Sequence, residues 1–259
     1  AALDFMMQFL GIPDSVEKYY EHDNSPEYRK VLESYCAGIN AYAETHPEEI
    51  PRKMKRYLPA EPKTVVQGYV FTGILFNGFP FALQYALEGR ADEHLPGYYV
   101  LGSNAIVFNN KKTGGEGTFI DINSHQPTEG IFSWYEVHIH TEEDMNILGG
   151  TFVGAPNIFH GVTPDLGWAA TLNYTDLYDF HRLEMHPKKK RLYKYDGEWH
   201  KLKKRKVKLP VKVWIFTLPI RRKVFDTKLG PAIKGKDGHY YAFQVVGSER
   251  VGMGEQSYR

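Results

Sequence analysis

The sequence predicts an α+β protein, because helical patterns fill its first part and strand patterns fill the rest. Two observations carry this prediction. Over residues 27–45 apolar side chains recur every three or four positions, which is typical of an amphipathic helix. After Tyr98, short runs of aromatic and β-branched residues alternate with Gly, Asn and Lys turns, which favours antiparallel strands.

The helix at 27–45 has recognisable ends. Ser25 supplies an N-cap and Pro26 a proline at the first helical position, whereas His46-Pro47 ends the helix. Two more helices are expected at 65–76 and 79–88, separated by Asn-Gly-Phe-Pro and followed by a polar connector at 89–97.

The first residues, 1–7, read as the inside of a helix and lack the basic region of a signal peptide. The chain is therefore expected to begin partway through its gene product.

The strand part is divided by turn residues, and Asp196-Gly197 between two strand patterns predicts a hairpin. The expected strands are 104–109, 117–122, 134–140, 145–151, 192–195, 198–202, 207–216, 224–227 and 240–246.

Bulk composition narrows the class of protein. A net charge of +1 gives no global case for nucleic acid, and no run of 18 apolar residues predicts a transmembrane span. The single cysteine, Cys36, excludes an intramolecular disulfide and lies in an apolar helical pattern typical of a buried thiol. Basic residues cluster at 188–191 and 201–208; a solvated hairpin is favoured over an anionic partner, because charge runs usually mark solvated faces.

Ser103 stands in an apolar strand run within Gly102-Ser103-Asn104, and no nucleophile elbow of the G-x-S-x-G type is present. By itself this tripeptide is more typical of a turn. A cut before Ser103 would give it an α-amine with a pKa near ~7.7–8.0, able to serve as its own general base. Gly102 would allow the strained backbone that such a self-cleavage needs.

The stretch from Gly102 resembles the start of the β-chain in penicillin acylases and acyl-homoserine-lactone acylases, which are N-terminal nucleophile (Ntn) hydrolases. Other family-like stretches follow in order and at family spacing over most of residues 30–259. They are 35–42 (Y-x-x-G-x-N-x-Y), 121–125 (D-x-H type), 134–138 (W-Y-E-V), 149–156 (G-x-T-x-P-G-x-P type), 161–171, 176–179 (D-x-x-D) and 229–231. Leu229, Thr163 and Val153 depart from the common His, Asn and Pro.

The resemblance implies the four-layer αββα Ntn-hydrolase sandwich, incomplete in this chain. Residues 1–102 would form the helical α-chain-like part with its connector, and 103–259 the β-chain-like part. The family's second oxyanion-hole residue, an asparagine, and a later catalytic arginine would lie beyond Arg259. The remaining α/β-chain sequence is therefore an expected partner.

The resemblance also assigns catalytic roles. Ser103 would supply both hydroxyl and α-amine, and the Leu172 backbone N–H would form half of the oxyanion hole, where only the amide is used. His125 would orient the amine or relay its proton, or would be a strand-end histidine without a catalytic role.

Substrate-binding positions follow in the same way. Gln126 and His160 match wall positions beside the nucleophile. Phe76 and Phe79, together with Phe81, would form an opposite apolar wall, although core packing explains these phenylalanines equally well.

A structural calcium ion is expected from Asp176 and Asp179, with the Tyr178 carbonyl between them, because calcium takes hard oxygen ligands in a bent loop. The alternative is that both carboxylates are plain turn residues. No organic cofactor is expected.

The function implied is that of a periplasmic or secreted acylase. It would hydrolyse an N-acyl amide, such as a penicillin or an N-acyl homoserine lactone, after autocatalytic cleavage of a zymogen at Gly102-Ser103. Two alternatives stay open: an uncleaved, non-catalytic relative, and a metal-dependent amidase built on His138, His140 and His160.

Overall fold

The chain is described by a computed structural model that covers residues 2–90, 102–130, 132–173, 177–214, 216–245 and 250–258. It forms two compact units that alternate along the sequence. Unit 1 comprises 1–19, 70–98 and 175–251, and unit 2 comprises 20–69, 99–174 and 252–259. Helices and antiparallel sheets are both present, so the predicted α+β class is confirmed. The αββα layering and the division at 102/103 stay predictions, and residues 91–97 of the predicted connector lie outside the described ranges.

Unit 1 is built on a five-stranded antiparallel sheet in the order β10-β11-β12-β13-β7. The strands are β7 (Tyr178–Arg182), β10 (Lys203–Val213), β11 (Phe216–Thr227), β12 (Gly230–Lys234) and β13 (Tyr240–Val245). A separate hairpin joins β8 (Leu192–Tyr195) to β9 (Glu198–Lys201). Its turn residues Asp196 and Gly197 have φ of 49° and 79°, as a type I′ turn requires, which confirms the predicted Asp-Gly hairpin.

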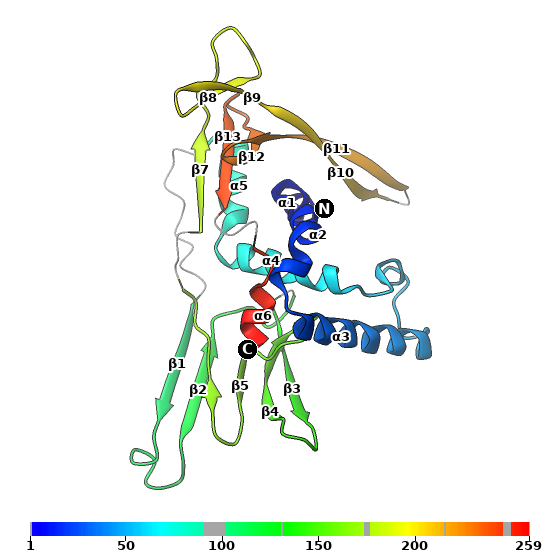
Figure 1. Cartoon of the computed structure of the whole chain (residues 1–259), viewed down its shortest axis with the longest axis vertical. Helices are drawn as coiled ribbons and strands as arrows, with labels where there is room; N and C mark the ends of the chain where they lie inside the picture. The colour runs from blue at the N-terminus through cyan, green and yellow to red at the C-terminus, as the bar shows by residue number, and fades with distance from the viewer. Residues whose placement is uncertain are drawn as a thin grey trace. The chain divides into compact units, whose positions relative to one another are not determined.

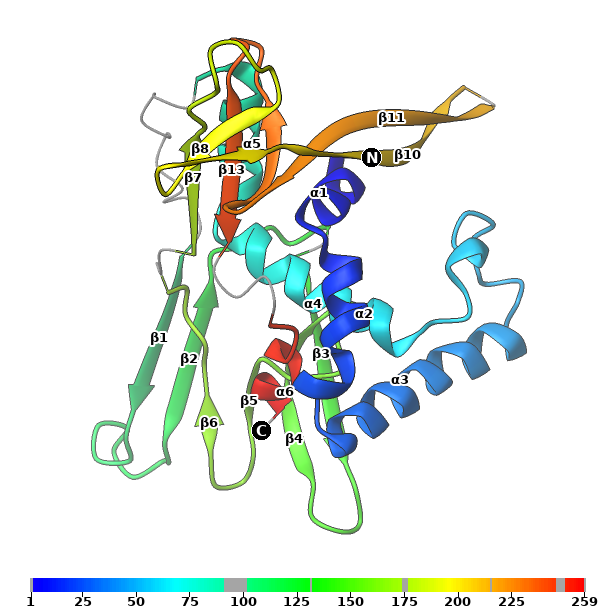
Figure 2. The same cartoon turned by 45° about the horizontal axis from the view of Figure 1, so that its top comes forward.

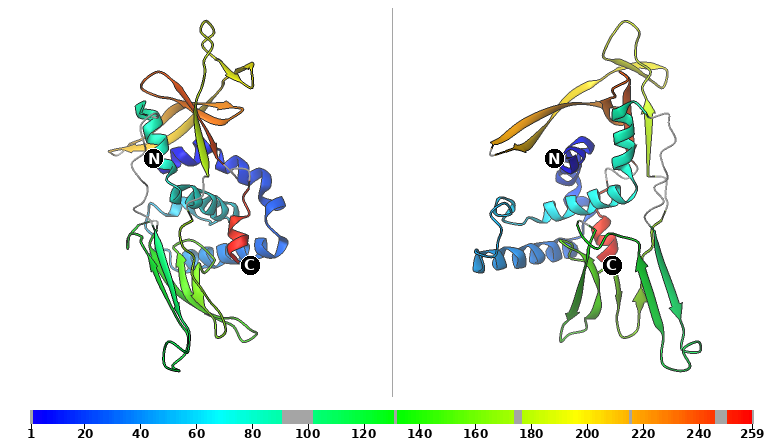
Figure 3. Two further views of the ribbon diagram at one scale, coloured as in Figure 1. Left: turned by 90° about the vertical axis from the view of Figure 1, so that its left-hand side faces the viewer. Right: turned by 180° about the vertical axis from the view of Figure 1, so that it is seen from behind.

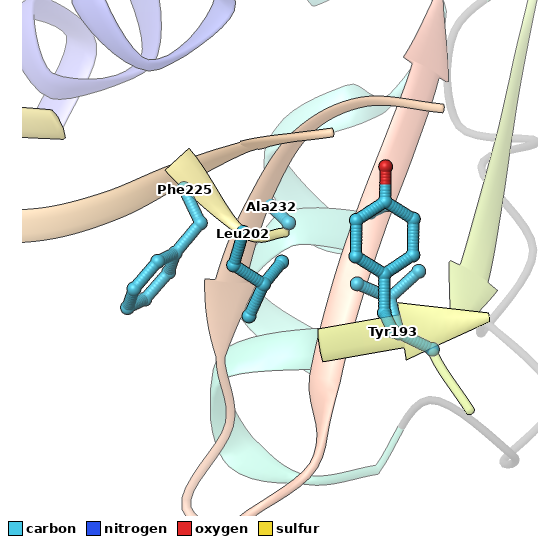
Figure 4. Packing of buried hydrophobic residues seen from close by; sticks show 6 residues of the cluster. Tyr193, Leu202, Phe225 and Ala232 are labelled. Carbon is cyan, nitrogen blue, oxygen red and sulfur yellow. The ribbon is translucent and has the colours of Figure 1, made fainter. Parts of the chain in front are cut away.

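Two groups of buried side chains hold unit 1 together. Phe9 of α1 (Ala2–Leu10) and Phe79 of α5 (Phe79–Glu88) both pack edge-to-face on Phe243 of β13. A second cluster joins the β8–β9 hairpin to the sheet through Tyr193, Leu202, Phe225 and neighbouring alanines (Figure 4).

Strands β10 and β11 form a ribbon of eleven cross-strand pairs, from Lys203↔Asp226 to Val213↔Phe216. Only residues 225–227 of β11 also pair with β12, so most of the ribbon extends past the rest of the sheet (Figure 1). The prediction of one strand over 207–216 is wrong, because the chain reverses at Trp214, whose φ is 55°. Non-glycine residues rarely adopt this conformation, and periodicity does not reveal it.

Unit 2 contains α3 (Pro26–Thr45), a short 3₁₀ turn η1 (Lys55–Tyr57) and α6 (Met253–Tyr258). As predicted, Ser25 caps α3, its Oγ accepting a hydrogen bond from the Tyr28 N–H at 3.2 Å. The Ser25 N–H in turn donates to Glu255 Oε2 at 2.7 Å. A glutamate 230 residues away therefore does what the third helical residue does in a capping box.

Helices α2 (Ile12–Asp23) and α4 (Pro62–Phe76) give residues to both units. In unit 2 the Cys36 side chain is buried, as predicted, and burial raises the pKa of its thiol. Over the described ranges no single helix is long and apolar enough to cross a bilayer; α4 and α5 meet that test only as a pair bent by 68°.

The strands of unit 2 form two antiparallel groups. The first pairs β1 (Ser103–Phe108) with β2 (Phe119–Ser124), and the second has the order β3-β4-β5-β6. The strands of the second group are β3 (Trp134–His140), β4 (Asn146–Phe152), β5 (His160–Val162) and β6 (Gly167–Trp168). Figure 2 shows β2 next to β6, and a Cβ placed on Gly167 would lie 3.4 Å from the Ile120 side chain. The two groups thus meet at this edge, which brings Ser103 toward β5.

Candidate active site around Ser103

Ser103 is the first residue of β1 and lies directly across from Ser124, the last residue of β2. Its side chain is half-buried, and its hydroxyl donates a hydrogen bond to the Gly102 carbonyl oxygen at 2.6 Å. The hydroxyl therefore lies against the carbonyl group of the peptide bond that precedes it.

The Gly102 carbonyl accepts a second hydrogen bond, from the His125 backbone N–H at 3.0 Å. Two donors on one oxygen polarise the carbonyl and would stabilise negative charge developing on that oxygen. The pairing of β1 with β2 creates this arrangement, because His125 immediately follows Ser124.

The His125 ring lies over Gly102. A Cβ built on Gly102 would be 3.1 Å from His125 Nδ1, closer than most real side-chain contacts. Gly102 does not have a left-handed φ, so the expected strained backbone is not what requires glycine here. Space for the imidazole is the physical reason instead.

Asn104 fixes the other side of this ring, with its Nδ2 3.0 Å from His125 Nε2. If Asn104 donates, as the assigned amide orientation has it, His125 carries its proton on Nδ1, the nitrogen that faces Gly102. The ring is then held between Asn104 and Gly102, the residues on either side of Ser103.

His160 of β5 contacts the same strand end through the Ser124 side chain. Its Nε2 lies 3.4 Å from Ser124 Oγ, and its Nδ1 accepts the Ala170 N–H at 3.0 Å. Since Nδ1 accepts, the proton of the neutral ring is on Nε2, which donates to Ser124. Burial lowers the pKa of His160, and the Trp134 ring packs on it with centroids 4.6 Å apart.

Leu172 follows two residues after Ala170 and is half-buried. Its segment is thus tied to the Ser103 strand pair through Ala170, His160 and Ser124. Gln126 has a buried Oε1 with no hydrogen-bond partner among the described residues, and its backbone N–H donates to the Ser124 carbonyl. A buried acceptor without a partner is available to a ligand donor.

Phe76 and Phe79 belong to unit 1, whereas Ser103 belongs to unit 2. Phe79 is fully buried between Tyr178 and Phe243, which fits core packing, and Phe76 is half-buried. Their assignment to a substrate wall stays a prediction.

The expected calcium ligands are only partly described, because Asp176 lies outside the described residues. Asp179 is exposed on β7 and follows the half-buried Tyr178. A carboxylate and a backbone carbonyl are donors that suit calcium, so the residues fit the ion by chemistry. The calcium site stays a prediction.

The three histidines of the metal-amidase alternative do not converge. His138 and His140 have ring centroids 6.3 Å apart on β3, and His138 Nε2 is 2.9 Å from Asn146 Oδ1, whereas His160 uses both nitrogens elsewhere. Within the described ranges no group of three His, Cys, Asp or Glu side chains is placed to hold a metal. That alternative is therefore wrong.

The sequence did not predict a role for two residues that support the site, Ser124 and Ala170. Ser124 stands across from Ser103 only because of the β1–β2 register, and Ala170 contributes a backbone N–H that any residue has. The Asp121–His125 stretch contained Ser124, but its role depends on the long-range contact with His160.

Comparison with known proteins gives the context of this geometry. A family model described as Penicillin amidase matches residues 1–258. The acyl-homoserine lactone acylase PvdQ of Pseudomonas fluorescens (strain Pf0-1) is 26% identical over 253 residues, 89% of this chain and 32% of that protein. Aculeacin-A acylase of Actinoplanes utahensis is 26% identical over 131 residues, 51% of this chain and 16% of that protein.

Among solved structures, a thermostable penicillin G acylase from Alcaligenes faecalis matches with a TM-score of 0.37 and 19% identity. The match covers 43% of this chain and 20% of that one, and at this TM-score it carries no argument. The chain spans about a third of the length of the curated acyl-homoserine lactone acylases that it matches along most of its own length. The family match over nearly the whole chain decides the assignment: this chain belongs to the penicillin amidase family.

Proposed function

We propose that this chain carries the nucleophile of an amidohydrolase, an acylase that cleaves N-acyl amides through an acyl-enzyme on Ser103. The observation that carries the proposal is the doubly hydrogen-bonded Gly102 carbonyl, held by the Ser103 hydroxyl and the His125 N–H. This is the carbonyl that Ser103 must attack to free its own amine.

In the proposed self-cleavage, Ser103 Oγ bonds to the Gly102 carbonyl carbon while the His125 N–H stabilises the oxyanion. The C–N bond then breaks, the Ser103 nitrogen takes the hydroxyl proton, and Gly102 is left as an ester on Ser103. Water hydrolyses this ester, which yields the Gly102 carboxylate, the free hydroxyl and the new α-amine.

In turnover, the α-amine would accept the proton of Ser103 Oγ as the oxygen attacks the substrate carbonyl carbon. The amine then returns the proton to the leaving nitrogen, and water hydrolyses the remaining acyl ester. We assign half of the oxyanion hole to the Leu172 N–H, and the second half to sequence beyond Arg259. The position of Leu172 in the segment joined to Ser124 through His160 supports this assignment.

Gln126 is assigned to substrate binding, because its buried Oε1 is suited to accept the N–H of a secondary amide. Penicillins and N-acyl homoserine lactones both contain such an amide. Export to the periplasm or medium and a structural calcium held by Asp176, Tyr178 and Asp179 belong to the same proposal. Calcium would be bound at the start of β7 and would take no part in the reaction.

The test uses the full protein and its Ser103→Ala and Ser103→Cys variants, with Ser133→Ala as a matched control. Mass spectrometry and N-terminal sequencing should find a fragment beginning at residue 103 in the wild type and the control. Ser103→Ala should give only the uncut chain and no turnover, whereas Ser103→Cys, which keeps a nucleophile, should still be cut.

A panel of N-acyl amides that differ in chain length and aromaticity then identifies the acyl group. If the wild type stays uncut and binds these amides without turnover, it is a non-catalytic relative and the proposal is wrong. If Ser103→Ala retains wild-type turnover, the nucleophile is another residue.

A further inference from the structure

The two faces of the β10–β11 ribbon differ in the number of charges they carry. In an antiparallel pair, directly opposed residues share a face and alternate residues along a strand do too. One face carries Lys204, Lys206, Lys208, Arg221 and Lys223, all exposed, and we call it the basic face. At its Lys204 end the basic face also holds Phe225, which is buried in the cluster with Tyr193 and Leu202. The opposite face buries Val207, Leu209 and Val224, carries Arg205 and Arg222, and has α1 packed on β10.

Like charges stand directly opposite one another on the basic face, where Lys206 pairs with Lys223 and Lys208 with Arg221. Such cross-strand pairs destabilise a sheet. Within the part of the chain that the structure describes, none of these five side chains forms an ion pair, and Asp226 pairs with Arg205 on the other face. The pKa of Lys204 is lowered, and the nearby charge of Lys223 is the largest cause. Burial and the charges of Lys206 and Arg191 lower it further.

The end of the ribbon carries apolar groups in solvent. Trp214 is 81% exposed at the turn, and Leu218, 51% exposed, lies on the face opposite the basic face. Pro210 and Pro219 face each other near the same end. From the front and from behind, the ribbon runs outward past the other strands of its sheet (Figure 1, Figure 3). An exposed indole beyond a row of cations has no partner among the described residues of unit 1.

We propose that the β10–β11 ribbon is a docking surface for an anionic phospholipid bilayer, with the basic face toward the headgroups and Trp214 in the interfacial layer. Each cation near such a surface gains from its negative potential, and five unpaired cations on one face sum these gains. Tryptophan is favoured at the depth of the headgroups because its ring is apolar and its N–H polar. The mutual repulsion of the cations is relieved when lipid phosphates lie between them.

A lipid surface fits better than a nucleic acid. Phosphates of a duplex would pair with the same cations, but they give no apolar environment for the exposed Trp214 at the end of the ribbon. The net charge of +1 supplies no general attraction to either kind of polyanion, so binding to a lipid surface has to come from this face.

The test measures sedimentation of the full protein with phosphatidylcholine vesicles made with and without phosphatidylglycerol. Binding should require phosphatidylglycerol and weaken with salt, which screens exposed charges. Lys206→Glu should weaken it about tenfold or more, because it reverses a central charge. Lys111→Glu, an equal charge change in the β1–β2 turn, should leave binding unchanged.

A loss of fold is separable from a loss of binding. Lys206→Glu faces Lys223 and turns a repulsive pair into an attractive one, so its Tm should not fall. Trp214→Ser should weaken binding by a smaller factor, about fivefold, that persists at high salt.

Equal binding to both kinds of vesicle, or equal effects of Lys206→Glu and Lys111→Glu, would overturn the proposal. Tighter binding to a DNA duplex than to the vesicles, with no effect of Trp214→Ser, would replace it with a nucleic-acid surface.

Discussion

Two of the protein's antiparallel ribbons, β1–β2 and β10–β11, use the same backbone geometry for opposite purposes. At the end of β1–β2, polar groups satisfy one another: Ser103 with Gly102, Asn104 with His125, and Ser124 with His160. On the basic face of β10–β11, like charges oppose one another without ion pairs among the described residues. Hydrogen bonds within the first ribbon hold its polar groups in fixed positions, as catalysis requires. The cations on the basic face of the second ribbon have no such partners among the described residues, so they are free to bind another molecule.

The largest expected effect comes from a substitution at Gly102, directly before the β1–β2 ribbon. Gly102→Val should slow self-cleavage by about 100-fold, because any Cβ there meets the His125 ring and shifts the groups around the Gly102 carbonyl. The half-time of appearance of the fragment beginning at Ser103 measures it. Ala105→Val, the same side chain on an exposed position of β1, should cleave at the wild-type rate; equal slowing in both would mean that strand stability matters and not the imidazole contact.

The next effect concerns Arg205, on the face of the β10–β11 ribbon opposite the basic face. Arg205 donates to the Gln8 and Phe9 carbonyls at the C-terminal end of α1, at 2.7 and 2.9 Å, and pairs with Asp226 at 3.2 Å. Arg205→Met should lower the free energy of unfolding by about 2 kcal/mol, measured by urea denaturation. A change below a few tenths of a kcal/mol would mean that α1 is held on the ribbon by apolar packing alone.

A third effect depends on pH and concerns His160 of β5, which contacts the β1–β2 ribbon through Ser124. The pKa of His160 is lowered by burial, so as pH falls below its ordinary value of 6.5 the unfolded state binds a proton before the folded state does. Stability should therefore fall from about pH 6.5 downward, by no more than about 1.4 kcal/mol per pH unit, and should not depend on this group above that pH. His160→Gln should flatten the slope in thermal melts, and an unchanged slope would assign it to another group.

The smallest expected effect is a gain in stability. Lys206→Met removes one cation from the pair with Lys223 without adding a new charge, and it should raise the free energy of unfolding by about 0.3 kcal/mol. Lys206 and Arg205 are adjacent, so the pair Lys206→Met and Arg205→Met compares the two faces of one strand directly. Destabilisation by both would mean that the basic face contributes to folding after all.

Local signals predicted most elements well. The periodic stretch at 27–45, with its Ser-Pro start, became α3 at Pro26–Thr45, and the pattern at 134–140 became β3 at Trp134–His140. In both cases the signal and its end are contained in neighbouring residues, so tertiary context had little to change.

Where partners are distant, prediction failed. The strand expected at 207–216 is a strand and a turn, and β11 begins eight residues before the strand expected at 224. Pro219 argues against a central strand, yet it is tolerated because only β10 pairs with β11 at that point. The support of Ser103 by His160 likewise depends on a register and on a contact 36 residues apart, which no local pattern encodes.

The capping of Ser25 by Glu255 has a consequence for the order of events during biosynthesis. Unit 2 receives residues 252–259 last, after all of residues 175–251 of unit 1 have left the ribosome. Each unit also draws on sequence from both sides of the Gly102-Ser103 bond. A chain cut there before Glu255 is made would lack the hydrogen bond from Ser25 to Glu255, one of the contacts that join its halves, whereas a chain cut afterwards could keep it.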